Sequence, residues 1–221
     1  MKIAIASLAL TLVSFSQAQD KVIVPRKDPV AGQHLMYSLE LTFLVMQQEA
    51  TFKGTAHQKV IKVEPDGSYE GESWLEKGVL HIMGSDQEQP EEHKVSKHLK
   101  GGQPVDKKEF ESGIDELLSA FSSSRVPESG AKVGDKWEVQ DWFGRLGKCE
   151  ATFLGLLKVG GKECASIMVA YSPIEGGSAE GKVYWGLESG DLVALDVRFS
   201  KVAIAQGIES DGTAKLTLIQ K

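Results

Sequence analysis

The stretch LMYSLELTF at residues 35–43 places a large apolar side chain at every second position. Extended backbone points alternate side chains to opposite faces, so Leu35, Tyr37, Leu39, Leu41 and Phe43 share one face. The positions between them carry mostly polar side chains. A period of two with one apolar face predicts a half-buried β-strand.

Similar runs follow along the rest of the chain. We expect strands at 52–63, 68–76, 79–83, 137–139, 149–157, 164–171, 183–185, 193–199 and 214–218, with residues 202–204 continuing one strand past a bulge. Turn chemistry separates them, as at Pro65-Asp66-Gly67, where Pro fixes φ and Gly accepts positive φ. About nine to eleven short strands joined by tight turns predict a mostly β, antiparallel arrangement.

One hairpin can be given a register from its turn. Gly160-Gly161 separates two apolar runs, which is typical of a two-residue β-turn. Pairing about that centre sets Leu157 opposite Cys164 and Cys149 opposite Ser172. The two cysteines, the only ones in the chain, would then lie roughly 25 Å apart along the ladder. We therefore expect two free, buried thiols rather than a disulfide.

The same hairpin has two apolar faces in this register. Phe153, Leu157 and Met168 would share one face, and Leu154, Leu156, Ile167 and Val169 the other. Such a hairpin is either covered on both sides or lines a cavity.

A single amphipathic helix is expected at 107–122. Asp106 with Glu109 three residues later forms a capping box. Phe110, Ile114, Leu117, Leu118 and Phe121 then fall on one helical face. A large sheet tends to curl, so we predict a curved antiparallel sheet, a half-barrel or open barrel, with this helix against its concave side. The mature chain reads as one domain over 33–221, with a polar loop at 84–105 that is broken by Gly and Pro.

The first residues predict export. Lys2 precedes an apolar run at 3–13, and Ser16 and Ala18 are the small residues expected before a cleavage site. We place a signal peptide at 1–18 and an extended lead-in at 19–32. The alternative is an uncleaved amphipathic or buried helix. We expect a periplasmic or extracellular protein with no lipid anchor on an N-terminal cysteine, and no membrane-spanning segment after cleavage.

The charge balance limits the classes of partner. The chain has 31 acidic and 25 basic residues, for a net charge of −6. An acidic chain without clustered Lys and Arg argues against binding nucleic acid and against electrostatic adhesion to anionic lipid. The absence of Asn rules out N-glycosylation, which favours a bacterial envelope, although composition bias explains it equally well.

No catalytic, cofactor-binding or metal site is predicted. His93 and His98 are five residues apart and share no ligand geometry on a helix or a strand, and His34, His57 and His81 are scattered. Residues 67–71 lack the spacing of a serine nucleophile motif. The tryptophans Trp74, Trp137, Trp142 and Trp185 are expected in the core or at its rim, with a ligand cleft as the alternative. An active site assembled from distant residues remains open.

One stretch resembles a known class. Residues 181–193, GKVYWGLESGDLV, run an aromatic strand into a Ser-Gly turn and then an alternating apolar strand. This resembles hairpins in exported bacterial proteins of the LolA-like, lipoprotein-carrier class. Residues 133–137 (VGDKW) and 161–165 (GKECA) resemble stretches of other exported bacterial families. The class usually has Asp after the aromatic, where this chain has Gly186. The resemblance implies a half-barrel that cups acyl chains, and no functional residue can be matched.

The leading hypothesis is an exported, non-catalytic domain that holds an apolar or amphipathic ligand, such as a lipid, or a partner segment, against the helix. The first alternative is a structural or interaction protein of the envelope with a filled core, with residues 84–105 contacting an envelope partner. The second is a hydrolase without a recognisable motif.

Overall fold

The computed structural model describes residues 21–26, 28–100, 105, 113–139, 147–172, 176–205 and 208–219. The expected signal peptide with its cut after Ala18, Trp142 and the first part of the expected helix, 107–112, lie outside the described residues.

In the described part of the chain, eleven strands form one antiparallel sheet. They are β1 (His34–Val45), β2 (Gln48–Val63), β3 (Tyr69–Ile82), β4 (Ser85–Glu88), β5 (Lys94–His98), β6 (Lys136–Glu138), β7 (Lys148–Val159), β8 (Lys162–Ser172), β9 (Ser178–Gly186), β10 (Leu192–Ala205) and β11 (Ile208–Leu218). The order across the sheet is β4-β3-β2-β1-β11-β10-β9-β8-β7-β6, and β5 also pairs with β3. The pairing of β1 with β11 joins two hairpin meanders into one sheet.

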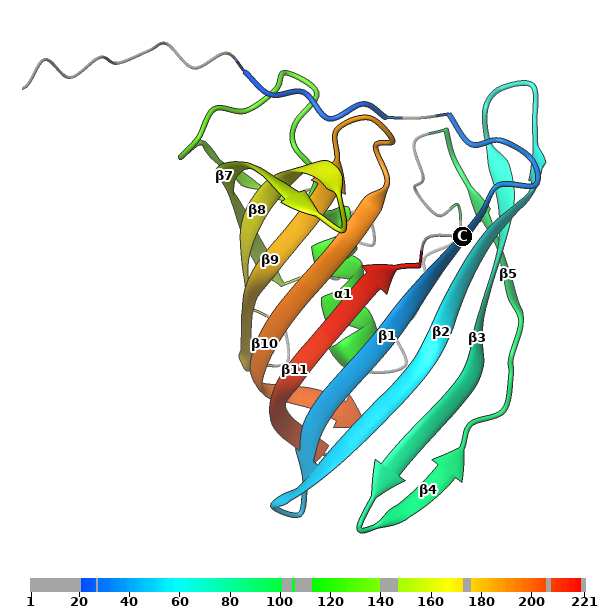
Figure 1. Ribbon diagram of the computed structural model, residues 1–221, viewed down its shortest axis with the longest axis vertical. Coiled ribbons are helices and arrows are strands. Elements are labelled where there is room, and N and C mark those ends of the chain that lie inside the picture. Colours follow the sequence, from blue (N-terminus) through cyan, green and yellow to red (C-terminus); the bar gives the residue numbers. More distant parts are fainter. Residues whose placement is uncertain are drawn as a thin grey trace, which may run out of the picture.

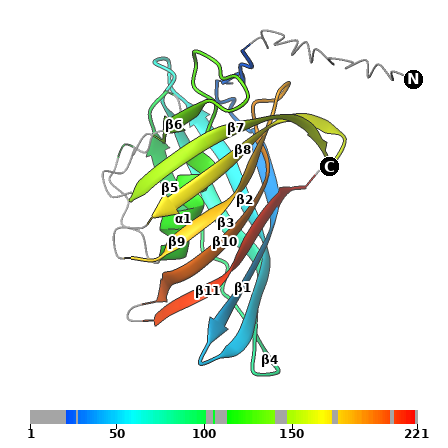
Figure 2. The same cartoon turned by 90° about the vertical axis from the view of Figure 1, so that its left-hand side faces the viewer.

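The sheet curves around the helix α1 (Gly113–Ser123), as Figures 1 and 2 show. The helix buries Ile114, Leu117, Ala120 and Phe121, and it packs mainly on β10, with smaller contacts to β8 and β9. Apolar residues at alternate positions of β7–β10 complete this core, among them Phe153, Ile167, Val183 and Val197. The predicted fold class, a mostly β curved antiparallel sheet with one inserted amphipathic helix, is confirmed. We call the helix side of the sheet the inner face and the opposite side the outer face.

Two predicted boundaries are wrong near the edge of the sheet. The segment 84–105, expected as one loop, contains β4 and β5, which both pair with β3. The run 79–83 is the end of β3 rather than a separate strand, because β3 continues through an irregularity at Lys77, where φ is 54°. Edge strands such as these are exposed and polar, so they carry no alternation of apolar residues.

The register of the β7–β8 hairpin is half as predicted. Leu157 lies opposite Cys164, but Cys149 lies opposite Tyr171 rather than Ser172. Gly155, at φ 124°, forms a bulge that shifts the pairing by one residue.

The bulge also changes which side chains share a face of the hairpin. Phe153 lies opposite Ile167, so it joins Ile167 and Val169 on one buried face instead of opposing them. Leu154, Leu156 and Leu157 are exposed. The predicted division into two apolar faces is therefore wrong for Phe153.

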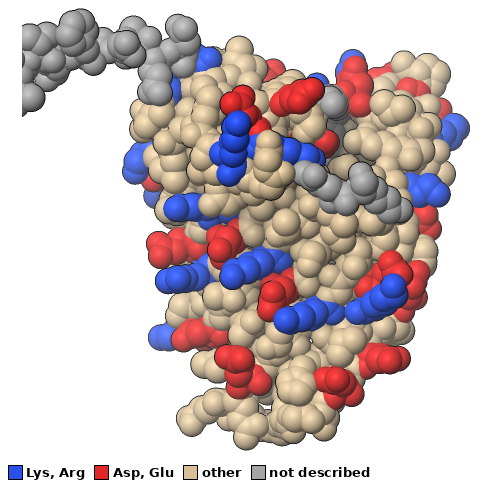
Figure 3. Space-filling model, in the orientation of Figure 1, with Lys and Arg blue, Asp and Glu red and all other residues tan. Residues whose placement is uncertain are grey.

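The outer face carries a row of alternating charges across five strands. Lys182, Asp196, Lys215, Glu40 and Lys53 are successive cross-strand neighbours on β9, β10, β11, β1 and β2. The Lys53 ammonium lies 3.1 Å from the Glu40 carboxylate. Basic and acidic side chains are interspersed over this surface in Figure 3. Opposite charges at directly paired positions favour this register over one shifted by two residues.

The lead-in is fixed to the domain. Val22 and Ala131 exchange two backbone hydrogen bonds of 2.9 Å, and Val24 is buried. The Arg125 guanidinium lies over the ring of Trp185, 4.2 Å from its centroid, and donates to the carbonyl oxygens of Pro25 and Gly190. Burial, together with the charge of Arg26, lowers the pKa of Arg125 to about 10. The lead-in therefore closes one end of the core.

Candidate functional site

The inner face is filled in one half and partly open in the other. The half formed by β7–β10 is covered by α1 and its core is buried. On β1–β3, five large apolar side chains of the inner face are only half-buried and do not belong to the core around the helix: Leu39, Phe52, Leu75, Leu80 and Ile82. We call these five residues the inner-face patch.

Strand register makes the patch continuous. Phe52 lies opposite Leu80 on β3 and opposite Leu41 on β1. Leu39 lies opposite Gly54, which has no side chain to cover it. The patch is therefore an apolar surface that runs across three neighbouring strands.

Two glycines allow Leu75 to lie close to the sheet. A Cβ added at Gly54 would lie 2.9 Å from Leu75 Cδ1, and one added at Gly78 would lie 2.8 Å from Leu75 Cδ2. The same atom at Gly78 would lie 3.2 Å from Phe52 Cζ. A larger residue at either position would push Leu75 away from the backbone, and one at Gly78 would also push Phe52 away. The glycines therefore let these side chains lie close to the sheet.

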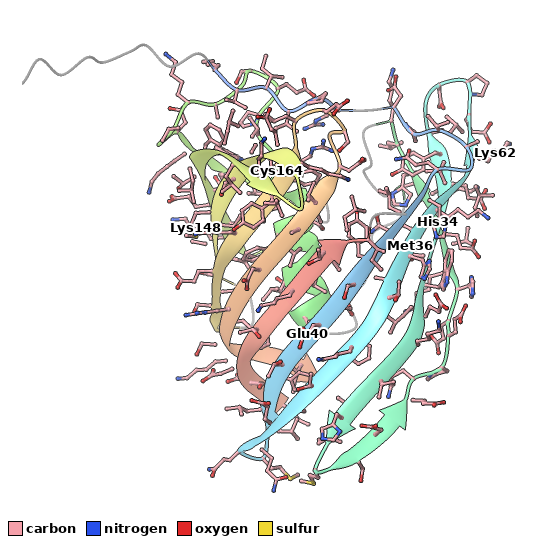
Figure 4. All side chains as sticks on the ribbon, in the orientation of Figure 1. His34, Met36, Glu40, Lys62, Lys148 and Cys164 are labelled. Atoms are coloured by element: carbon pink, nitrogen blue, oxygen red, sulfur yellow. The ribbon has the colours of Figure 1, made fainter. Side chains whose placement is uncertain are left out.

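The outer face of the same strands carries a second feature, a cluster of four aromatic rings in which His34 also lies 5.3 Å from Trp74, centroid to centroid. His34 of β1, His57 of β2, Trp74 of β3 and His93, just before β5, form what we call the histidine–tryptophan stack. The ring centroid of Trp74 lies 4.4 Å from that of His57 and 4.9 Å from that of His93, with the planes inclined by 10° and 14°. Because β3 lies between β2 and β5, the two imidazoles cover opposite sides of the indole. Figure 4 labels His34 and Met36 on β1, where Met36 is the residue paired with His57.

A chain of hydrogen bonds runs from His34 to Glu76. His34 Nε2 lies 2.9 Å from His57 Nδ1, and His57 Nε2 lies 3.0 Å from Glu76 Oε2. The centroids of the two imidazoles are 5.1 Å apart. This is close to the distance between the two nitrogen atoms plus the radius of each ring, so the two rings meet through their edges. With one N–H on each ring, His34 donates to His57 and His57 donates to Glu76. Both contacts are thus satisfied when both rings are neutral.

His93 contacts two carboxylates. Its Nδ1 lies 2.8 Å from Glu72 Oε1 and its Nε2 lies 2.9 Å from Glu91 Oε1. The hydrogen bonds to Glu72 and to Glu91 raise the pKa of His93 above its ordinary value. The structure therefore brings together His34 and His57, which were expected to be scattered, with His93, and His57 is buried, with 5% of its surface exposed.

The remaining predicted residues are separate from the stack. His81 contacts Asp86 at 2.7 Å, and His98 stacks on Tyr69. The Trp185 indole N–H donates to the carbonyl of Ser124, and Trp185 lies in the core, as expected. In the part of the chain that the structure describes, no group of three or more His, Cys, Asp and Glu side chains is arranged to hold a metal ion.

Both cysteines are free and buried, as predicted. Burial raises the pKa of the Cys149 thiol to about 11, and it also raises the pKa of Cys164. Neither thiol is therefore an activated nucleophile.

Among the described helices, none is long and apolar enough to cross a bilayer. A cavity of about 280 Å³ lies at the end of the sheet between the β1–β2 turn and β10–β11, lined by Leu44, Met46, Lys201 and neighbouring residues. It does not coincide with the patch or with the stack.

The comparisons with known proteins return distant structures. No protein-family model matches the chain, and no curated protein matches it. Lipoprotein LppX of Mycobacterium tuberculosis is 12% identical, with 85% of each chain covered and a TM-score of 0.32. A DUF1329 family protein from Desulfovibrio piger is 10% identical, with 84% of each chain covered and a TM-score of 0.26.

A domain from Vibrio parahaemolyticus, assigned to outer membrane lipoprotein sorting, is also 10% identical. It covers 85% of this chain and 83% of its own, with a TM-score of 0.22. One of these structures is thus a lipoprotein-sorting domain, the class that residues 181–193 resemble, at a low superposition score. The fold itself rests on the strand pairing described above.

Proposed function

We propose that this chain is an exported, non-catalytic binding protein that holds an apolar or amphipathic ligand against the inner-face patch of β1–β3. The observation that carries the proposal is that the five side chains of the patch remain half-buried beyond the core that α1 covers. Burying a large apolar side chain fully stabilises a complex by about 1.5–3 kcal/mol relative to leaving it exposed. Covering the unburied part of five neighbouring side chains would supply several kcal/mol.

Two further features support this proposal. Gly54 and Gly78 keep the surface low under Leu75 and Phe52, which leaves room for a flat or extended apolar group. Apolar pockets with few polar groups are typical of binding sites for small apolar molecules. The sequence pattern at 1–18 supports export to the periplasm or the exterior, where such a ligand would be met.

The test is native mass spectrometry of the secreted chain, purified without detergent and without organic solvent. The proposal predicts a population with the added mass of a small apolar molecule, which organic extraction removes and releases for identification. A bare polypeptide mass, together with no binding of an apolar dye, would contradict it. That result would favour the alternative of an envelope interaction protein with a filled core. Turnover of a generic ester, glycoside or phosphate substrate would favour a hydrolase.

A further inference from the structure

The histidine–tryptophan stack joins the exposed strand β5 to the rest of the sheet. β5 pairs only with β3, from Tyr69 opposite His98 to Ser73 opposite Lys94. Its residues are almost all exposed, so few apolar contacts hold it. His93, at the start of β5, adds a ring contact with Trp74 and two carboxylate contacts.

The two contacts of His93 require a proton. A neutral imidazole has one N–H donor and one acceptor nitrogen, so it can donate to Glu72 or to Glu91 but not to both. The second carboxylate would then face a nitrogen lone pair, which repels it. A protonated imidazole donates to both carboxylates and also places a cation over the face of Trp74.

His34 and His57 behave differently. Their contacts with each other and with Glu76 are complete with one proton on each ring. They form a fixed support for one side of Trp74, while His93 covers the other side. The geometry therefore separates a pair of contacts that one proton on each ring completes from a ring, His93, that needs a second proton.

From this geometry we propose that His93 is a proton-operated clasp that fastens β5 and the preceding connection to β3, closing as the pH falls and loosening as it rises. The proposal does not depend on the inner-face ligand, since the stack lies on the outer face. In a secreted protein it would couple the attachment of this sheet edge to the acidity outside the cell membrane.

Titratable or charged groups lie on every element next to the clasp. Glu72 and Glu76 come from β3, Glu91 and Glu92 from the connection, Lys94 and Lys97 from β5, His57 and Lys59 from β2 and His34 from β1. Lys59 lies opposite Glu72 in the strand pairing. Lys77 contacts Glu76 at 3.2 Å and neutralises part of its charge. The carboxylates Glu72 and Glu91 are the two in direct contact with the ring, and they set the sign of the effect.

The direction with pH follows from the raised pKa of His93. A group whose pKa is higher in the folded than in the unfolded state stabilises the fold fully below the unfolded value, about 6.5 for His. That stabilisation is lost as the pH rises through the folded pKa. Attachment of β5 should thus be strongest in mild acid and weaken toward alkaline pH.

The experiment combines NMR titration of the histidine side chains with hydrogen exchange of the β5 amides. We expect the titration midpoint of His93 to fall in Glu72→Gln and in Glu91→Gln. We expect protection of the amides of residues 94–98, corrected for intrinsic exchange, to decrease several-fold between mild acid and pH 9 in the wild type. The decrease should be much smaller in His93→Gln, which keeps a polar side chain but cannot gain a proton.

His81→Gln is the matched control, because His81 lies on β3 with one carboxylate partner, Asp86 at 2.7 Å, at the β3–β4 edge. This variant should keep the wild-type pH dependence of β5. Protection of β5 that does not change with pH in the wild type, or that changes equally in His93→Gln, would overturn the proposal. If a variant fails to fold, the pH dependence of β5 protection in the wild type still tests the proposal.

Discussion

The imidazole of His57 lies flat against the indole of Trp74, with ring centroids 4.4 Å apart and planes inclined by 10°. The two residues are paired across β2 and β3. Ala56, which precedes His57, and Leu75, which follows Trp74, are paired with each other and face the inner side of the sheet. The contact between the two rings therefore stabilises, on the outer face, the pairing of β2 with β3, which carry most of the inner-face patch.

Replacing Trp74 with Leu should destabilise the fold by about 1–3 kcal/mol, because the indole makes ring contacts on both sides and each aromatic pair is worth about 0.5–1.5 kcal/mol beyond its burial. Urea unfolding measures the loss. Trp74→Phe keeps a stacking ring and should lose less. Equal losses for the two variants would show that stacking contributes nothing there.

Replacing Lys215 with Glu should destabilise the sheet by about 0.2–1 kcal/mol, because it sets three carboxylates in a row with Asp196 and Glu40. The loss should shrink at high salt, which screens exposed charges. Thr217→Glu is the control, since its cross-strand neighbours are the uncharged Ser38 and Ala194. If Thr217→Glu costs as much as Lys215→Glu, the charge row does not stabilise the register.

Replacing Gly155 with Ala should cost about 1–3 kcal/mol, because its φ of 124° is a conformation that residues with a Cβ rarely adopt. The nearest atom to an added Cβ is Val133 Cγ2 at 3.5 Å, an ordinary contact, so the cost comes from the backbone. Gly71→Ala, where φ is not positive and the added Cβ finds only contacts of 3.6 Å, should be nearly neutral. Thermal unfolding of both variants checks this, and a neutral Gly155→Ala would argue against the bulge.

The cysteines should be unreactive in the folded protein at pH 8, because burial keeps the thiols protonated and covered, with the pKa of Cys149 at about 11. Titration with a thiol reagent should detect two thiols after denaturation without reductant. Finding neither thiol under those conditions would indicate a disulfide and contradict the strand pairing that separates the two residues.

The architecture was predictable from sequence because apolar alternation is strong where one face of a strand is buried. Residues 35–43 and 193–199 carry that pattern, and both strands lie at the centre of the sheet. β4 and β5 were missed because an exposed edge strand buries neither face. Bulges are the other source of error, since the bulge at Gly155 changed which residues share a face. A lone glycine inside a strand is a signal for such a bulge, but the register was counted from the turn alone.

The histidine–tryptophan stack could not be predicted because a strand irregularity changes which residues pair. Counting outward from the Pro65-Asp66-Gly67 turn pairs Val63 with Tyr69, as observed, and would set His57 opposite Leu75. An irregularity between Val60 and Lys62 shifts the register by one and sets His57 opposite Trp74 instead. The alternation of residues 68–76 does place Trp74 on the outer face, but the shift of one residue hides its pairing with His57. His93 could not be placed, because β5 was not predicted.

The most direct test of the binding claim is the affinity of the mature chain for an apolar fluorescent probe, measured for the wild type, Leu39→Glu and Ser38→Glu. Leu39 belongs to the inner-face patch, and Ser38, the preceding residue, is exposed on the outer face. Wild type and Ser38→Glu should bind the probe alike, whereas Leu39→Glu should bind it at least tenfold more weakly while still unfolding cooperatively. Equal affinity of the two variants, or no binding by the wild type, would contradict the binding claim.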